Sequence, residues 1–250
     1  MNTGILVTVR TGSTRLPGKA MKHVHSKPVI EYLVDRIKFA AGDASRVIIC
    51  TTTLEEDTVL RKISEDTGAD FFQGEPENII KRHYQCARHF GLDFIVNVDG
   101  DDILCSPEYV RGIIDFIKKS ANFDVVRTTH LPFGMNSMGY KTEVLKRILR
   151  DTLGEIDTGW GRLITDENEF SIYTFPSVEG EILEARLSLD YQEDFLLFKE
   201  IIENLLINDP YLSTVQIIDY LKKNPVLVKS NIHLNEIYWE NFNKKQVQKG

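Results

Sequence analysis

The chain has 250 residues, of which 42% are hydrophobic and 27% are charged, as in ordinary globular proteins. Its net charge of −7 argues against a protein that binds nucleic acid through a broad basic face. No apolar run is long enough to span a bilayer, and the N-terminus lacks the basic segment of a signal peptide. We therefore expect a cytoplasmic protein without a nucleic-acid or membrane partner.

Short apolar strands alternate with amphipathic helices over the first half of the chain. We expect strands at residues 4–9, 46–52, 69–74, 93–98 and 123–129, and helices at 28–42, 55–68, 76–91 and 106–120. This alternation predicts a parallel, doubly wound sheet with helices on both faces. Cys50, Cys86 and Cys105 lack metal-ligand spacing, and we expect them to lie in or near the core of a protein from a reducing compartment.

The alternation ends after residue 129, where residues 130–139 bring Pro and Gly. We expect a helix at 140–151, a polar loop at 157–170, strands at 170–176 and 184–190, helices at 191–206 and 212–225, and a frayed tail at 243–250. Because no linker or repeat is visible, we expect a single domain over residues 1–250, with residues 130–185 as an inserted lobe.

The first strand leads directly into a basic loop, within the stretch "VTVRTGSTRLPGKAM". Arg10, Arg15 and Lys19 could surround a polyphosphate, and Ser13 could donate a hydrogen bond to it. Backbone amides of the glycine-containing turn, and the N-terminus of a following helix, can also bind phosphate oxygens. The loop has neither the P-loop spacing nor the dinucleotide-binding fingerprint. It predicts a polyphosphate site of another kind.

Carboxylates follow the fourth strand in "NVDGDDILCSPE", where Gly100 permits a sharp turn. Asp99, Asp101 and Asp102 would repel one another unless a cation lies among them. Mg²⁺ commonly takes one or two protein carboxylates together with substrate phosphates and water, so this loop is a candidate Mg²⁺ site. The alternative is a solvated acidic turn that caps the next helix at Ser106.

A further carboxylate, Asp190, ends the strand expected in "RLSLDYQED" and could reach the same cation as Asp101. Glu193 and Asp194 begin the next helix, where the helix dipole favours acidic residues in any case. Two weaker candidates remain for nucleotide binding. They are Thr52, which could hydrogen-bond a base or ribose from the end of the second strand, and the helical Arg82, which could contact phosphate.

A polyphosphate loop and two separated aspartates together suit nucleotidyl transfer. A nucleoside triphosphate and Mg²⁺ are held so that an oxyanion attacks the α-phosphorus and pyrophosphate leaves. Such a reaction needs positioning and charge neutralisation more than a protein nucleophile.

The motifs resemble those of the cytidylyltransferases that activate acidic sugars, including the acylneuraminate and KDO (3-deoxy-manno-octulosonate) enzymes. "VRTGSTRLPGKAM" is similar to the opening of the spore-coat polysaccharide branch, and "GEPENIIKRHYQCARHFGLDFIVNVDGDD" and "RLSLDYQED" resemble its later segments. The resemblance implies a three-layer Rossmann-like nucleotidyltransferase sandwich with a mostly parallel sheet. It also implies CTP as donor, Mg²⁺ as cofactor, an acidic acceptor, and a homodimer formed through the lobe at 130–185.

Carried onto this sequence, the resemblance gives a role to every candidate residue except Thr52, whose role is expected from its place at a strand end. Arg10, Ser13, Arg15, Lys19, Thr52 and Arg82 are expected to bind the nucleotide, Asp101 and Asp190 the metal, and Arg10, Lys19 and Asp101 are expected to be catalytic. The family often has Pro where this chain has Ile103, which leaves Asp102 as an alternative ligand to Asp101.

Other functions remain open at this point. They are guanylyl or uridylyl transfer to a sugar phosphate, activation of a phosphonate, and a non-catalytic nucleotide-binding module. A glycosyltransferase that uses Asp99-Gly-Asp101 as its Asp-x-Asp motif is a further alternative.

Overall fold

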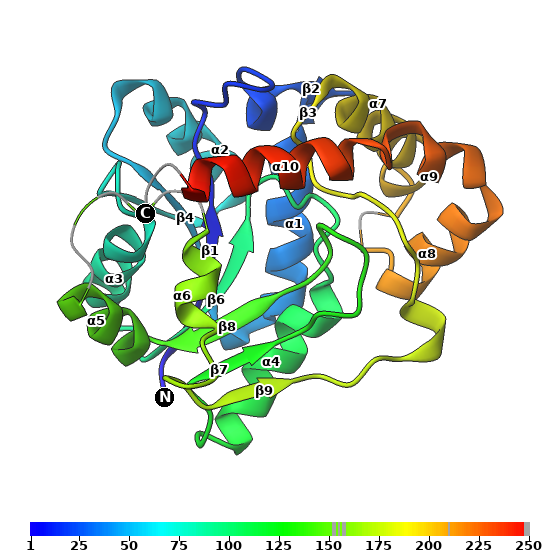
Figure 1. Ribbon diagram of the computed structural model, residues 1–250. Helices are drawn as coiled ribbons and strands as arrows, with labels where there is room; N and C mark the ends of the chain where they lie inside the picture. Colours follow the sequence, from blue (N-terminus) through cyan, green and yellow to red (C-terminus); the bar gives the residue numbers. More distant parts are fainter. Residues whose placement is uncertain (152–153, 155, 157–158, 210, 248–250) are drawn as a thin grey trace.

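The computed structural model describes residues 1–151, 154, 156, 159–209 and 211–247. A seven-stranded sheet with the order β5-β4-β1-β6-β8-β7-β9 lies at the centre (Figure 1). Its strands are β1 (Thr3–Thr8), β4 (Arg46–Thr52), β5 (Asp70–Gly74), β6 (Phe94–Asp99), β7 (Val125–Arg127), β8 (Met138–Lys141) and β9 (Ile172–Thr174). β5, β4, β1 and β6 are parallel, whereas β8 runs antiparallel to both of its neighbours. The expected mostly parallel sheet is confirmed.

Helices cover both faces of the sheet and form a three-layer structure (Figure 1). One layer contains α1 (Val29–Ala41), α2 (Leu60–Thr67) and α4 (Pro107–Lys119), and the other contains α3 (Ile79–Phe90), α5 (Thr142–Asp151) and α6 (Trp160–Ile164). Successive strand side chains point to opposite faces, so Ile5 and Val7 of β1 pack with the first layer and Leu6 packs with the second. Burial on both faces explains why the middle of β1, residues 5–7, is apolar throughout.

The C-terminal part of the chain adds helices around the sheet. They are α7 (Gln192–Ile201), which continues as a π-helical turn over Ile202–Leu206, then α8 (Thr214–Lys223), α9 (Pro225–Asn231) and α10 (Leu234–Val247). α10, red in Figure 1, crosses the edge of the sheet at which β1 and β6 end. This edge is where open α/β sheets bind their ligands.

Four predictions for the second half of the chain are wrong. Residues 184–190 do not form a strand, since only Arg186 makes a bridge, to Phe133, and the Leu189 amide donates to the Asp101 carbonyl in another loop. β8 begins at Met138, inside the segment expected to break the pattern. The expected polar loop contains α6, because Trp160 and Ile164 lie one helical turn apart and are both buried.

The fourth wrong prediction is the frayed tail. α10 continues to Val247, and residues 248–250 of the expected tail lie outside the described residues, as do 157–158 of the expected loop. The segment 130–185, expected as a lobe, contributes β8 and β9 to the main sheet.

Two expectations from composition concerned the cysteines and membrane spans. All three cysteines are free and buried, which confirms their expected place in or near the core. None of the helices in the described ranges is long and apolar enough to cross a membrane.

Candidate active site

The carboxyl ends of β1 and β6 lie side by side and bring the basic loop next to the acidic loop. Thr8 is in register with Asp99, and the Gly100 amide donates to the Thr8 carbonyl at 2.8 Å. A Cβ atom on Gly100 would lie 2.5 Å from Cβ of Val9. Glycine is therefore required at this position by the close packing of the two loops, and not by the sharp turn that we expected.

The basic loop does not lead directly into a helix. It ends in a single 3-10 turn at Lys19–Met21 and a short hairpin of β2 (His23–Val24) and β3 (Lys27–Pro28), and α1 begins only at Val29. The helix expected at 28–42 is thus confirmed, but a turn and a hairpin separate its N-terminus from the basic loop. The positive charge of the loop comes from its side chains.

A cavity of about 510 Å³ opens between the two loops. Among the predicted residues, Arg10, Ser13, Arg15, Lys19, Arg82 and Asp101 line it. Asp190 is 1% exposed and lies beneath it, in contact with Arg15 and Lys19. The structure thus brings seven of the eight predicted site residues together, from segments that are far apart in the sequence.

Lys19 lies between the two aspartates that the sequence predicts as metal ligands. Its Nζ is 2.6 Å from Oδ2 of Asp101 and 3.0 Å from Oδ1 of Asp190. Burial alone would lower the pKa of Lys19, but the charges of Asp101 and Asp190 outweigh this effect and raise it. The two carboxylates therefore converge on one point, which a positive charge occupies.

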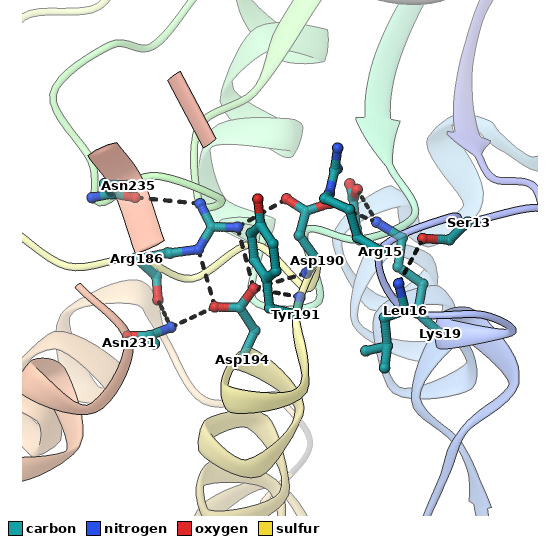
Figure 2. Close-up of polar contacts among 11 residues, drawn as sticks. Ser13, Arg15, Leu16, Lys19, Arg186, Asp190, Tyr191, Asp194, Asn231 and Asn235 are labelled. Carbon is teal, nitrogen blue, oxygen red and sulfur yellow. Dashed lines mark hydrogen bonds and ion pairs between the residues drawn. The ribbon is translucent and has the colours of Figure 1, made fainter. Parts of the chain in front are cut away.

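Asp190 contacts three cations, as Figure 2 shows. Arg15 and Lys19 both donate to its Oδ1, and Nη2 of Arg186 donates to its Oδ2 at 2.9 Å. Burial would raise the pKa of Asp190, yet Lys19 and Arg15 lower it to about 2. Asp190 is consequently ionised at any physiological pH.

Sequence reasoning missed Arg186, which holds Asp190 in place. Arg186 is fully buried and also donates to Asp194, from Nε to Oδ1 at 3.0 Å (Figure 2). Asp194 accepts from the backbone amides of Asp190 and Tyr191 at 2.9 Å each, and from Nδ2 of Asn231 at 2.8 Å. Asp194, which we attributed to the helix dipole, is thus the internal partner of a buried arginine. The spacing of Arg186, Asp190 and Asp194 at intervals of four gave no usable signal, because residues 184–190 are not helical.

The charges in this cluster balance. Lys19, Arg15 and Arg186 face Asp101, Asp190 and Asp194. Removing one partner of a buried ion pair leaves an uncompensated charge and typically costs about 3–5 kcal/mol. A phosphate or metal ion that binds here must therefore replace one of the side chains in an existing ion pair.

The remaining carboxylates of the acidic loop have a different environment. Burial and the charge of Asp101 raise the pKa of Asp99 to about 6. Burial, followed by the charges of Asp101 and Asp99, also raises the pKa of Asp102, which accepts a hydrogen bond from Ser188. Within the described chain, no group of three or more His, Cys, Asp or Glu side chains is arranged to hold a metal by itself. A metal here would draw further ligands from the substrate.

Thr52 lies away from the cavity. It is fully buried, and its hydroxyl donates to Asp57. Asp57, which sequence reasoning also missed, accepts from the backbone amide of Thr11 at 2.6 Å and from its hydroxyl at 2.7 Å. Thr52 and Asp57 thus tie the basic loop to β4. Direct contact between Thr52 and a nucleotide stays a prediction.

Arg82 reaches the cavity from α3. Although it is only 3% exposed, it lines the cavity, and its Nη1 donates to the Glu75 carbonyl at 2.9 Å. The sequence alone could not distinguish it from a solvated helical arginine.

A chain of buried hydrogen bonds leads from the acidic loop into the core. Tyr140 lies 2.7 Å from Nδ1 of His83, and Nε2 of His83 lies 2.9 Å from the Thr8 hydroxyl. Thr8 donates to Asn97 at 2.6 Å, and Asn97 donates to Asp99 at 2.9 Å. One His83 tautomer, protonated on Nε2, satisfies the whole chain. The imidazole is therefore neutral in the folded protein.

We expect this histidine to make stability fall in mild acid. Burial, with a smaller contribution from Arg82, lowers the pKa of His83 to about 3. An unfolded histidine titrates near pH 6.5, so the stabilisation is complete above that pH and is lost as the pH falls toward 3. Between pH 6.5 and 4.5 the free energy of unfolding should fall by about 2–3 kcal/mol more than in His83→Gln, which cannot titrate.

Urea unfolding of both proteins at several pH values measures this difference. Because Asp99 and Asp102 titrate in both proteins, their effect cancels in the comparison. Parallel pH profiles for the two proteins would contradict a buried neutral His83.

The sequence is similar to one family model and to several known proteins. A family model described as cytidylyltransferase matches residues 5–217. An uncharacterised Methanocaldococcus jannaschii protein is 26% identical over 235 residues, 92% of this chain and 95% of that protein. The spore coat polysaccharide biosynthesis protein SpsF of Bacillus subtilis is 24% identical over 231 residues, covering 88% and 94%. The 3-deoxy-manno-octulosonate cytidylyltransferase of Aeromonas salmonicida is 29% identical over 120 residues, but the match covers only 46% of each chain.

Solved structures share the fold. A cytidylyltransferase from Leptospira borgpetersenii superposes with a TM-score of 0.80 at 23% identity, covering 91% of this chain and 97% of that one. A CMP:2-keto-3-deoxy-manno-octonic acid synthetase solved with CTP gives a TM-score of 0.62 at 14% identity, covering 82% and 99%. A Mycobacterium tuberculosis protein solved with manganese gives 0.55 at 16% identity, covering 79% and 97%. At these identities the likeness shows the fold alone.

Proposed function

The chain belongs to the cytidylyltransferase family, and from this premise we propose that it transfers CMP from CTP to an acidic small molecule with release of pyrophosphate. The observation that carries the proposal is the position of Lys19 between Asp101 and Asp190, on the wall of a cavity that the basic loop also lines. A triphosphate and a metal ion need these opposite charges next to each other. The SpsF similarity favours a role in the synthesis of precursors for glycans or surface polysaccharides.

The basic side chains of the cavity would hold the triphosphate. Arg10, Arg15 and Lys19 come from the loop after β1, and Arg82 comes from α3. Ser13 would add a hydroxyl donor. Thr52 would support the site through its bond to Asp57, which fixes the loop, and its direct contact with the nucleotide remains the expectation from the sequence. By neutralising the β- and γ-phosphates, these groups would stabilise pyrophosphate as the leaving group.

Asp101 and Asp190 would hold Mg²⁺. Their oxygens fit this ion, since both converge on the ammonium of Lys19, and Mg²⁺ commonly binds one or two carboxylates together with substrate phosphates. When bound, the ion would neutralise charge on the α-phosphate. The structural neighbour solved with manganese supports a divalent ion in this fold. Asp102 would remain bonded to Ser188.

The reaction requires no covalent intermediate on the protein. An oxygen of the acceptor forms a bond to the α-phosphorus, and the bond from the α-phosphorus to the bridging oxygen breaks, which releases pyrophosphate. The protein's part is to align the two substrates and to compensate charge. A homodimer is a further proposal that follows from the family resemblance, whereas a cytoplasmic location and a single domain over residues 1–250 are proposals from the sequence pattern.

Pyrophosphate release from each nucleoside triphosphate, with Mg²⁺ and a panel of acceptors, tests this function. The panel contains 3-deoxy-manno-octulosonate, N-acetylneuraminate and glucose 1-phosphate. We expect release that requires CTP and one of the two sugar acids. Release from GTP or UTP with glucose 1-phosphate would favour a different nucleotidyltransferase, and binding of a nucleotide sugar without binding of any triphosphate would favour a glycosyltransferase.

A further inference from the structure

Helix α10 forms part of the cavity wall although it lies outside the segment matched by the family model. The match ends at residue 217, whereas α10 spans Leu234–Val247. Tyr238, Asn241 and Phe242 of this helix line the same cavity as the basic loop and Asp101. The comparison with the family therefore assigns no role to these side chains.

Several contacts fix α10 over the site. Nη1 of Arg186 donates to Oδ1 of Asn235 at 3.3 Å, so the arginine that holds Asp190 also holds the helix (Figure 2). The Tyr238 ring packs on Phe133, with centroids 5.4 Å apart, and the Arg162 guanidinium lies 4.8 Å from the centroid of the Phe242 ring. The helix is thus attached both to the metal aspartate and to α6.

The side of the cavity formed by α10 differs chemically from the loop side. We call this side the α10 wall, and its members are Phe133, Trp160, Tyr238, Asn241 and Phe242. Four of the five are aromatic, and the fifth is an amide. The lining residues in the described ranges that carry positive charge, Arg10, Arg15, Lys19 and Arg82, belong to the loop and to α3.

The two sides of the cavity suit two different substrates. A triphosphate needs the basic side, and it leaves few cations for the second substrate. Aromatic rings with a single amide suit the C–H surfaces and hydroxyls of a sugar-like carbon skeleton.

We propose that the α10 wall is the acceptor subsite and that Asn241 and Phe242 determine how strongly a hydroxylated acceptor binds there. This inference rests on the proposed function, because it presupposes that CTP occupies the basic side. Asn241 would hydrogen-bond a hydroxyl of the acceptor, and Phe242 would pack against its carbon skeleton.

The test uses the full-length protein with CTP, Mg²⁺ and 3-deoxy-manno-octulosonate or N-acetylneuraminate. In Asn241→Ala and Phe242→Ala we expect kcat/KM for the acceptor to fall about tenfold, as for the loss of one hydrogen bond or one ring contact. CTP binding, measured by calorimetry, should change less than about twofold in either variant. Asn243→Ala is the matched control, since Asn243 is on the same helix but does not line the cavity.

Each outcome bears on one claim. Normal acceptor kinetics in both variants, or an equal loss of CTP and acceptor affinity, would overturn the assignment of the wall. A fall in kcat/KM for the acceptor no larger than that of Asn243→Ala would also overturn it. Absence of CTP binding in the unaltered protein would instead overturn the proposed function.

Discussion

Replacing Asp190 with asparagine is expected to abolish metal-dependent turnover and to strengthen the binding of CTP in the absence of metal. The first effect follows from the loss of one of two carboxylates that converge on the metal position. A metal ion stabilises the transition state by several kcal/mol, so we expect kcat to fall by about 10³-fold or more.

The second effect follows from the balance of charges. Without metal, Asp190 is the counter-ion of Arg15 and Lys19, and a triphosphate must compete with it for both. The neutral amide in Asp190→Asn would release these cations while its oxygen still accepts a hydrogen bond from Arg186. We expect metal-free CTP to bind about tenfold more tightly, which corresponds to about 1.4 kcal/mol.

Calorimetric titration of CTP in EDTA measures this gain. Asp35→Asn is the control for net charge, because Asp35 pairs with Lys27 in a separate ion pair. Equal or weaker metal-free binding in Asp190→Asn would show that Asp190 does not hold the basic groups back from the triphosphate.

Lys19→Ala is expected to lower kcat/KM for CTP by about 10²–10³-fold, the usual cost of losing a cation that stabilises a developing charge. Lys19 is 13% exposed on its side chain and touches both Asp101 and Asp190, so few groups could replace it. Removing it also leaves two carboxylates facing each other, and CTP binding should become more dependent on metal.

Steady-state kinetics with varied CTP and Mg²⁺ measure the effect. Lys22→Ala is the matched control, since Lys22 lies three residues further on and packs against Phe195 outside the cavity. CTP kinetics like those of the unaltered protein in Lys19→Ala would remove this residue from triphosphate binding.

Much of the site could be predicted because its parts follow strands with clear sequence signals. β1 and β6 are mostly apolar and buried, and the polar residues that follow them must lie at one edge of a parallel sheet. The structure places Thr8 opposite Asp99 and so brings the basic and acidic loops together. That the two loops meet follows from the order and direction of the strands alone, and the alternation of strands and helices in the sequence indicates both.

The supporting residues could not be predicted in the same way. Arg186, Asp57 and His83 act through partners that lie between 4 and 75 residues away in the sequence. Each looks like an ordinary polar residue until burial removes water from it. Burial depends on the packed core, which local patterns do not show.

The second half of the fold was harder to predict for a related reason. The apolar alternation of residues 184–190 is typical of a strand, and Leu187 and Leu189 are indeed buried, but their amides bond to Phe133 and Asp101 in separate loops. Gly134 (φ 94°) allows this contact, because a Cβ there would lie 2.1 Å from the Leu187 carbonyl oxygen. Periodicity predicts which side chains are buried, but not which backbone groups pair.

The central claim is that the basic loop holds a triphosphate whose metal is held by Asp101 and Asp190. A crystal structure with CTP and Mn²⁺, in which anomalous scattering locates the metal, tests it most directly. We expect the metal peak between Asp101 and Asp190, with Arg15 and Lys19 turned from Asp190 to the phosphates. A metal peak elsewhere, or a triphosphate bound away from the loop while Lys19 stays between the two aspartates, would contradict the account.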